Sequence, residues 1–189
     1  MLGAVAVMAL PSCGGGKPEP LKPVSQWKAY RAEGGGYGME VPVGWTVTEA
    51  GAAGGFRTTI RADDDNWIVV SKDILPGELE AKLMRSDTRD EAIIGAVQSH
   101  YRSLAQQFVS SQSTAPQPGT VANAMAGFGS FTASKEAGFG VRTREVEGAT
   151  ALVIGLNYLY IFDAFADPGS SEIVGSAFDH VLNSFRFDE

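Results

Sequence analysis

The run from Ala151 to Phe162 constrains the fold more than any other stretch, because both of its faces are apolar. One alternating set of positions carries leucine, isoleucine, tyrosine and phenylalanine, and the other carries Val153, Leu159 and Ile161. Side chains of a strand point alternately to its two faces, so a strand with two apolar faces belongs in the middle of a sheet that is covered on both sides. The run therefore predicts one central strand, entered through a hairpin turn at Glu147–Gly148.

Two amphipathic patterns can supply that cover. After Asp167, Ser170 or Ser171 can cap a helix that runs to about Asn183 with one apolar side. Earlier, the segment 88–91 matches a capping box, in which a threonine and a glutamate satisfy free backbone donors at a helix start. A single apolar stripe follows it at spacings of four and three, formed by Ile93, Val97, Tyr101, Leu104 and Phe108.

The remaining segments predict mostly antiparallel strands joined by short turns. Two strands in 38–48 are broken at Pro42 to Gly44, where proline sets the turn and glycine tolerates positive φ. The other expected elements are strands at 27–31, 56–60, 67–71, 125–134 and 139–146, a short helix at 78–85, a polar loop at 110–119 and an extended tail at 184–187. The fold class is therefore α+β, a central antiparallel sheet flanked by helices.

Composition excludes several classes of function. A chain of 189 residues with one set of apolar patterns fits a single domain, expected over 27–189. The net charge of −7, with only 15 lysines and arginines, argues against a nucleic-acid partner, which needs a clustered basic surface. The single cysteine excludes an intramolecular disulfide.

That cysteine stands in a sequence that resembles a bacterial lipobox. A short apolar run, 2–10, precedes Pro11, Ser12 and Cys13. The resemblance implies a signal peptide over 1–12, cleavage between Ser12 and Cys13, and lipidation of Cys13. Pro11 is an unusual occupant, and no basic residue precedes the apolar run. The alternative interpretation is an incidental cysteine after a disordered start.

The segment 13–26 is rich in glycine and proline and predicts a flexible tether. Its relaxed span is ~20 Å and its taut limit ~45 Å, so the domain would work close to a membrane. In lipoproteins an aspartate after the cysteine favours the inner membrane. Gly14 stands there instead, which implies an outer membrane, with the domain facing the periplasm.

The order of elements over about 27–187 resembles the PsbP-like superfamily. The residues that carry the resemblance are Tyr37-Gly38, the early turn with Pro42, Gly44 and Trp45, the long middle helix, and the closing segment at Ser184-Phe185. The resemblance implies an α/β/α sandwich of the kind found in DcrB-type bacterial lipoproteins. It implies no chemistry, because members of one fold perform unrelated tasks.

Residues able to carry chemistry are few. His100 and His180 are the only histidines, and a zinc site needs three or four converging ligands, so we expect no metal site and no cofactor. The acidic stretch Asp63–Asn66 lacks the glycine and distal glutamate of a calcium loop, which favours a hairpin turn. The glycine-rich stretch 34–38 precedes a strand and favours an entry loop over a phosphate cradle. The aromatic residues Trp45, Trp67, Tyr158 and Tyr160 fit a core better than a ligand groove.

The leading hypothesis is a lipid-anchored cell-envelope protein that acts as a non-catalytic binding or assembly module. Its partners would be the membrane, through the lipid, and an envelope protein or cell-wall polymer. One alternative is an envelope hydrolase that uses a serine, an aspartate and His180. A second alternative is a purely structural envelope component.

Overall fold

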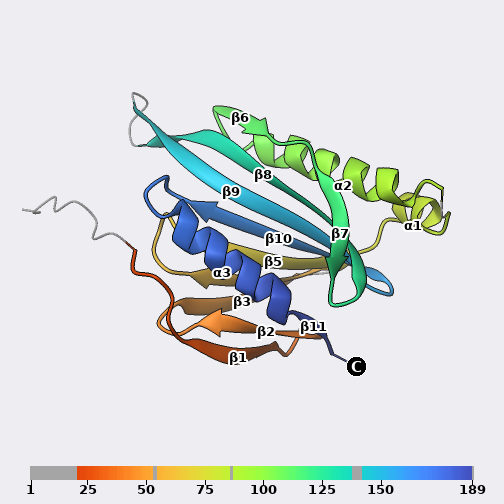
Figure 1. The fold of residues 1–189 in the computed structure, drawn as a ribbon, viewed down its shortest axis with the longest axis horizontal. Helices are drawn as coiled ribbons and strands as arrows, with labels where there is room; N and C mark the ends of the chain where they lie inside the picture. Colours follow the sequence, from red (N-terminus) through yellow and green to blue (C-terminus); the bar gives the residue numbers. More distant parts are fainter. Residues whose placement is uncertain (1–20, 53–54, 86, 138–141, 189) are drawn as a thin grey trace, which may run out of the picture.

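The computed structural model describes residues 21–52, 55–85, 87–137 and 142–188. Within these ranges, one antiparallel sheet of eight strands forms the centre of the molecule (Figure 1). Its order is β3-β4-β5-β10-β9-β8-β6, and β7 also pairs with β8. The strands are β3 (Thr46–Ala52), β4 (Gly55–Arg61), β5 (Trp67–Ile74), β6 (Ser110–Ser113), β7 (Gln117–Val121), β8 (Ala124–Ala137), β9 (Arg142–Ile154) and β10 (Tyr158–Ala166).

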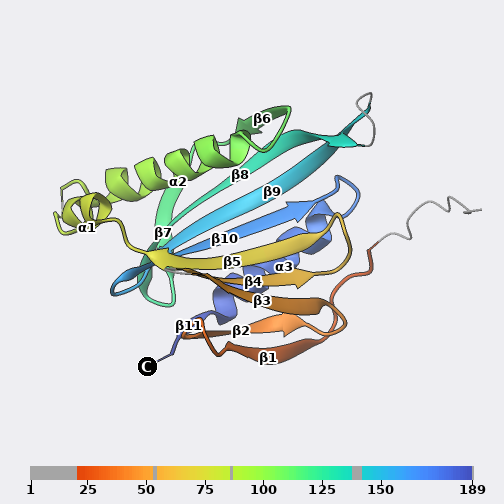
Figure 2. The ribbon, with the colours of Figure 1, turned by 180° about the vertical axis from the view of Figure 1, so that it is seen from behind.

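Helices cover both faces of this sheet, as the sequence predicts. The helices α1 (Gly77–Leu83) and α2 (Arg89–Ala105) lie on one face, and α3 (Ser171–Ser184) lies on the other (Figures 1 and 2). One buried cluster joins α2 to Leu152, Leu159 and Phe165, and a second joins α3 to Val153 and Phe162. The two parities of the strands thus supply two separate cores, and the predicted α+β sandwich is confirmed.

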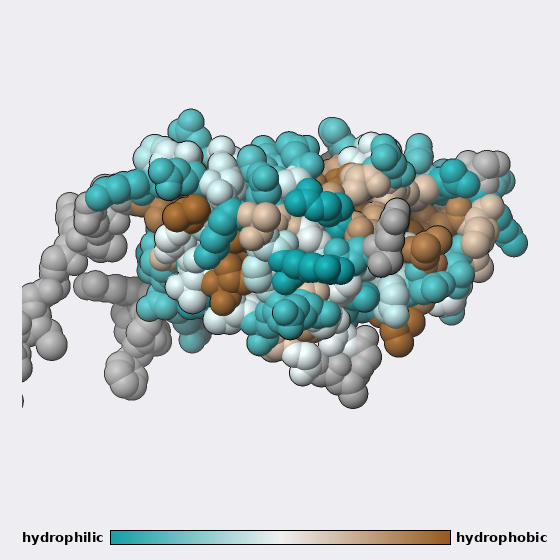
Figure 3. All heavy atoms as spheres, turned by 90° about the horizontal axis from the view of Figure 1, so that it is seen from below, coloured by the Kyte–Doolittle hydropathy of each residue, from teal (hydrophilic) through white to brown (hydrophobic). Residues whose placement is uncertain are grey.

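A second, smaller sheet lies beside α3. It contains β1 (Trp27–Ala32), β2 (Tyr37–Pro42) and β11 (Arg186–Phe187) in the order β1-β2-β11. The predicted break at Pro42 to Gly44 is confirmed, and Gly44 has the positive φ of 92° that the turn requires. This turn takes the chain out of the small sheet, because β2 belongs to it and β3 belongs to the large one. Seen from the small-sheet side, hydrophobic residues fall into groups divided by hydrophilic ones (Figure 3).

The prediction of one central strand from Ala151 to Phe162 is wrong. The run is a hairpin in which β9 ends at Ile154 and β10 begins at Tyr158. The backbone N–H of Gly155 donates to the carbonyl of Tyr158 at 2.8 Å, which closes the turn. Leu156 occupies the turn with 96% of its surface exposed, so an apolar residue hid the turn in the sequence pattern. The turn predicted at Glu147–Gly148 is also wrong, because both residues lie inside β9.

Three other expectations fail locally. The expected loop at 110–119 contains β6 and most of β7, which pair with β8 along the sheet edge. The expected capping box is absent, because the Thr88 hydroxyl donates to the carbonyl of Lys82 at 3.0 Å and makes no cap bond to α2. Ser170 does precede α3, but its hydroxyl bonds to Asp167 at 3.3 Å instead of capping the helix.

Candidate functional site

A groove follows the border between α2 and the sheet. Its first part, here called the α1 cavity, has a volume of about 770 Å³ and lies among α1, α2, β9 and β10. Its second part, the Trp67 cavity, has a volume of about 560 Å³ and lies between the end of α2 and the faces of β4, β5 and β10. His100, Ser103 and Ile161 line both cavities, so the two adjoin each other, and together they are called the α2 groove. Pockets of roughly 300–1,000 Å³ hold most small ligands.

A buried polar cluster lies at the junction of the two cavities. Asp163 sits in the middle of the apolar strand β10 and is only 8% exposed. His100 Nε2, on α2, lies 2.9 Å from Asp163 Oδ1 and 3.0 Å from Oδ2, and the ring N–H donates to the carboxylate. The hydroxyl of Thr150, on β9, donates to Asp163 Oδ1. Thr150 and Asp163 face each other directly because the register of β9 and β10 pairs them.

Tyr101 lies next to this polar cluster, beneath α2. Its hydroxyl packs against Gly129, and the register of β8 and β9 pairs Gly129 with Thr150. Gly129 is required there, because a Cβ would lie 2.3 Å from the Tyr101 hydroxyl oxygen. That hydroxyl has no hydrogen-bond partner among the described residues, and burial raises the pKa of Tyr101 well above its usual value. A buried hydroxyl without a hydrogen-bond partner lowers the stability of the fold, so Tyr101 and the cluster beside it are not optimised for stability alone.

The arrangement of the cluster fits a binding site better than a catalytic site. Ser99 and Ser103 line the same groove as His100, so a hydroxyl and a His–Asp pair are close together. Both serines lie inside α2, where backbone N–H groups are already used by the helix. A serine nucleophile needs free donors beside it to stabilise an oxyanion, and a helix interior does not provide them. The groove is therefore suited to hold a ligand through hydrogen bonds.

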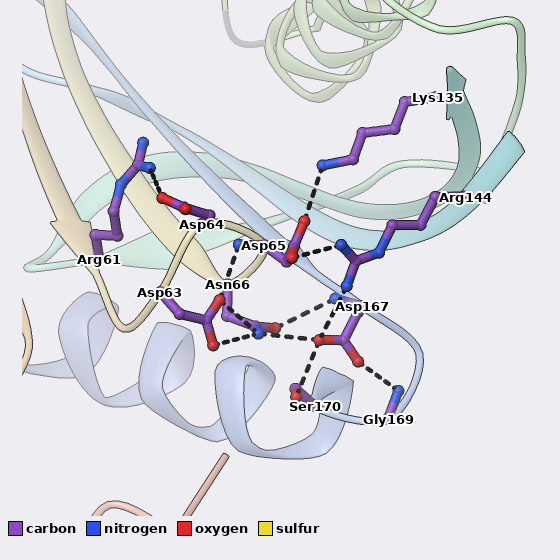
Figure 4. Close-up of polar contacts among 10 residues, drawn as sticks. All are labelled: Arg61, Asp63, Asp64, Asp65, Asn66, Lys135, Arg144, Asp167, Gly169 and Ser170. Atoms are coloured by element: carbon purple, nitrogen blue, oxygen red, sulfur yellow. Dashed lines mark hydrogen bonds and ion pairs between the residues drawn. The ribbon is translucent and has the colours of Figure 1, made fainter. Parts of the chain in front are cut away.

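The acidic stretch Asp63–Asn66 forms the hairpin turn that the sequence predicts (Figure 4). Asp63 accepts hydrogen bonds from the backbone of Asp65 and from the Asn66 amide, which also bonds to Asp167. Asp65 pairs with Lys135 at 3.2 Å and with Arg144. Burial alone would raise the pKa of Asp65, but hydrogen bonds from these two cations lower it overall. The network joins the β4–β5 and β10–α3 loops to the paired strands β8 and β9. No metal-ligating group of three or more side chains is found among the described residues.

His180 lies far from this groove, on the opposite face of the sheet. Its ring stacks on Trp27 with centroids 3.6 Å apart, and Nε2 lies 2.7 Å from Glu40 Oε2. The nearby Ser184 hydroxyl donates to the carbonyl of Val181 and accepts from the Glu40 backbone. This places His180 beside a glutamate and a tryptophan, and not in the serine–aspartate site of the hydrolase alternative.

The other predicted residues have mixed positions. Trp45 is buried in the core beside the early turn, and Tyr160 is also buried, as expected for core residues. Trp67 stacks on Phe165 and lines the groove, and Tyr158 is 39% exposed beneath the Lys72 ammonium. Ser12 and Cys13, and so the expected cleavage and lipidation sites, lie outside the described residues. In the part of the chain that the structure describes, no helix is long and apolar enough to cross a membrane.

Asp163 and Thr150 were not predicted from the sequence. A signal was available, since Asp163 interrupts the apolar run of β10 and an acidic residue in such a strand needs a partner. The identity of that partner was not readable, because His100 is 63 residues away and the register of three strands brings the cluster together.

Comparison with known proteins supports the fold. No family model matches the chain, and no match was found among curated proteins. Among solved structures, cyanobacterial PsbP (CyanoP) from Synechocystis sp. PCC 6803 is similar, with a TM-score of 0.58, 17% identity, and coverage of 94% of this chain and 98% of the other. The Ran-binding protein Mog1p of Saccharomyces cerevisiae is similar with a TM-score of 0.55, 13% identity, and coverage of 87% and 96%. The chain therefore has a PsbP-like fold.

Proposed function

We propose that this protein is a non-catalytic binding module of the bacterial cell envelope, held at a membrane by a lipid on Cys13, and that the α2 groove is its binding site. The observation that carries the binding function is the His100–Asp163–Thr150 cluster, which places hydrogen-bonding groups at the junction of two cavities. The lipobox-like sequence and Gly14 support the anchor and an outer-membrane location facing the periplasm.

The binding site is tested by crosslinking in the native cell. A photoreactive amino acid replaces Ser99, which is exposed and lines the α1 cavity, or Ser176, which is exposed on α3. We expect crosslinked products, whether a protein, a cell-wall polymer or a small molecule, from position 99 and few from position 176. Equal yields at the two positions, or none at position 99, would contradict the assignment of the groove.

The anchor is tested separately. Cys13→Ala should move the protein from the membrane fraction to the soluble fraction, because the lipid supplies most of the membrane affinity. Membrane association that survives this substitution would exclude the lipid anchor and leave the groove proposal untouched.

A second candidate function is hydrolysis, and one observation favours it: Ser99 and Ser103 line the groove beside the His100–Asp163 pair. The test is turnover of a panel of ester and amide substrates by the purified full chain. Turnover that His100→Ala abolishes and His180→Ala preserves would establish the hydrolase and exclude the non-catalytic module.

A further inference from the structure

The α2 groove changes its chemistry along its length. The α1 cavity has an aliphatic floor of Leu152, Leu159 and Ile161, and Leu79, Ala92 and Ala96 continue this surface onto α1 and α2. Its other lining residues include the charged Glu78, Lys82, Arg85 and Glu91. None of the described residues that line it is a tryptophan, tyrosine or phenylalanine. Sugars and nucleobases are usually held against aromatic rings, whereas an aliphatic wall of this size suits a flexible hydrocarbon chain. The α1 cavity is therefore suited to an alkyl chain.

The Trp67 cavity combines hydrophobic side chains, among them Trp67, Phe108 and Phe165, with many hydrogen-bond donors. Arg57, Lys135 and His100 line it, together with Ser71, Ser103 and Gln107. Arg57 forms no ion pair within the described part of the chain, and Lys135 bonds to Asp65 while its ammonium lies 5.4 Å from the Trp67 ring centroid. Asp163 and Asp73 are the acidic lining residues, and the carboxylate of Asp163 already accepts from His100 and Thr150. Apart from the Asp73 carboxylate, the polar groups left to meet a ligand are cationic and neutral donors, of which Lys135 is shared with Asp65.

We propose that the α2 groove binds a single-chain anionic amphiphile, with the alkyl chain in the α1 cavity and the anionic head in the Trp67 cavity beside Arg57, Lys135 and His100. This ligand class rests on the proposed function, in which the same groove is the binding site. A free fatty acid and a lysophospholipid share this chemistry, and the experiment distinguishes them.

The experiment is calorimetric titration of the full chain carrying Cys13→Ser, without detergent. The ligands are decanoate, dodecanoate and tetradecanoate, dodecanol as the uncharged analogue, and lysophosphatidylglycerol as the alternative anionic source. We expect affinity to rise about fourfold per methylene, since each buried methylene contributes a nearly constant increment. Tighter binding of the fatty acid or of the lysophospholipid identifies the source.

Gly95 provides the blocking variant. It lies inside α2, lines the α1 cavity, and a Cβ built on it meets nothing within 4 Å. Gly95→Phe should fill the cavity without disturbing the helix and reduce affinity at least tenfold. Gly175→Phe is the matched control, because Gly175 lies inside α3 with equally open space. Arg57→Gln should lower the affinity for dodecanoate and leave that for dodecanol unchanged.

Three results would overturn the assignment: no binding of either anionic amphiphile, affinity that does not depend on chain length, or equal binding by the Gly95→Phe and Gly175→Phe variants. Capture of an envelope partner at position 99 combined with any of them would leave the proposed function standing and reject only the amphiphile.

Discussion

The buried cluster makes a specific prediction about energetic coupling between Thr150 and Asp163. Thr150 is 1% exposed, and its hydroxyl donates to the carboxylate of Asp163. A hydrogen bond to a charged group stabilises a fold by about 1.5–3 kcal/mol, so Thr150→Val, which keeps the shape, should lower the free energy of unfolding by about 2 kcal/mol. Asp163→Leu should cost about 2–4 kcal/mol, because it leaves the Thr150 hydroxyl buried without an acceptor. His100 adds less, since its side chain is 17% exposed and reaches water.

The double variant should cost clearly less than the sum of the single variants. When both partners are apolar, neither leaves the other unpaired. His100 loses its acceptor in Asp163→Leu and in the double variant alike, so that cost cancels and we expect a coupling free energy of about 2 kcal/mol. The assay is equilibrium urea unfolding followed by circular dichroism for the wild type, both single variants and the double variant. A matched control combines Thr150→Val with Tyr37→Phe. Tyr37 bonds to Thr58 at 2.7 Å in the other buried cluster, so this pair should be additive within about 0.5 kcal/mol.

Additivity of Thr150→Val and Asp163→Leu within that same margin would refute the reasoning, because it would mean that the two side chains contribute independently. A stable double variant that no longer binds ligand would show that the polar cluster is retained for recognition and not for stability.

Three further perturbations test other parts of the structure. Gly148→Ala should cost about 3 kcal/mol or more in urea unfolding, because its Cβ would lie 2.6 Å from the Ala164 carbonyl oxygen; a cost below 1 kcal/mol would show that the strands yield easily. Arg144 and Lys135 hold the pKa of Asp65 below its unfolded value despite burial, so Asp65 stabilises the fold above about pH 4 and this contribution is lost as the pH falls through the folded pKa. The difference in unfolding free energy between wild type and Asp65→Asn should therefore shrink between about pH 5 and pH 2, and a constant difference would contradict it. Tyr101→Phe should be neutral or stabilising in thermal unfolding at pH 7, since it removes an unpaired buried hydroxyl. Because burial raises the pKa of Tyr101, the wild type should also lose stability above about pH 10 more steeply than this variant.

The sequence predicted the layers of the fold because apolar periodicity reports directly on burial. The stripe from Ile93 to Leu104 and the two-faced apolar runs could only be satisfied by helices on both sides of a sheet. The early turn was equally readable, since Gly44 tolerates a backbone conformation that other residues resist.

The failures came where an apolar or polar pattern was misleading. Leu156 continued the apolar run through a turn, although the turn leaves it almost fully exposed. The strand β6 has four exposed residues and no alternation, so only its pairing with β8 reveals it. The threonine of the expected capping box bonds backward to Lys82, a choice set by the α1–α2 connection.

The candidate site was less predictable than the fold. His100 was visible as one of two histidines, but its partner depends on where α2 rests over β10. The Trp67 cavity combines residues from β4, β5, α2, β8, β9 and β10, and local sequence patterns do not specify such an assembly.

The way the chain enters the domain limits how the molecule can stand on a surface. Leu21 and Val24 pack against the core, and the Gln26 carbonyl accepts a hydrogen bond from the Val43 backbone at 3.0 Å. If Cys13 carries the lipid, only the seven residues 14–20 separate it from Leu21. A segment of this length spans at most ~25 Å when fully extended. The entry point and the β9–β10 turn lie at opposite ends of the molecule (Figures 1 and 2). If the molecule stands upright on the membrane, the α1 cavity faces away from that membrane, toward whatever protein or membrane supplies or receives the ligand. If the molecule lies flat, the cavity can take its ligand from the membrane leaflet that holds the lipid anchor.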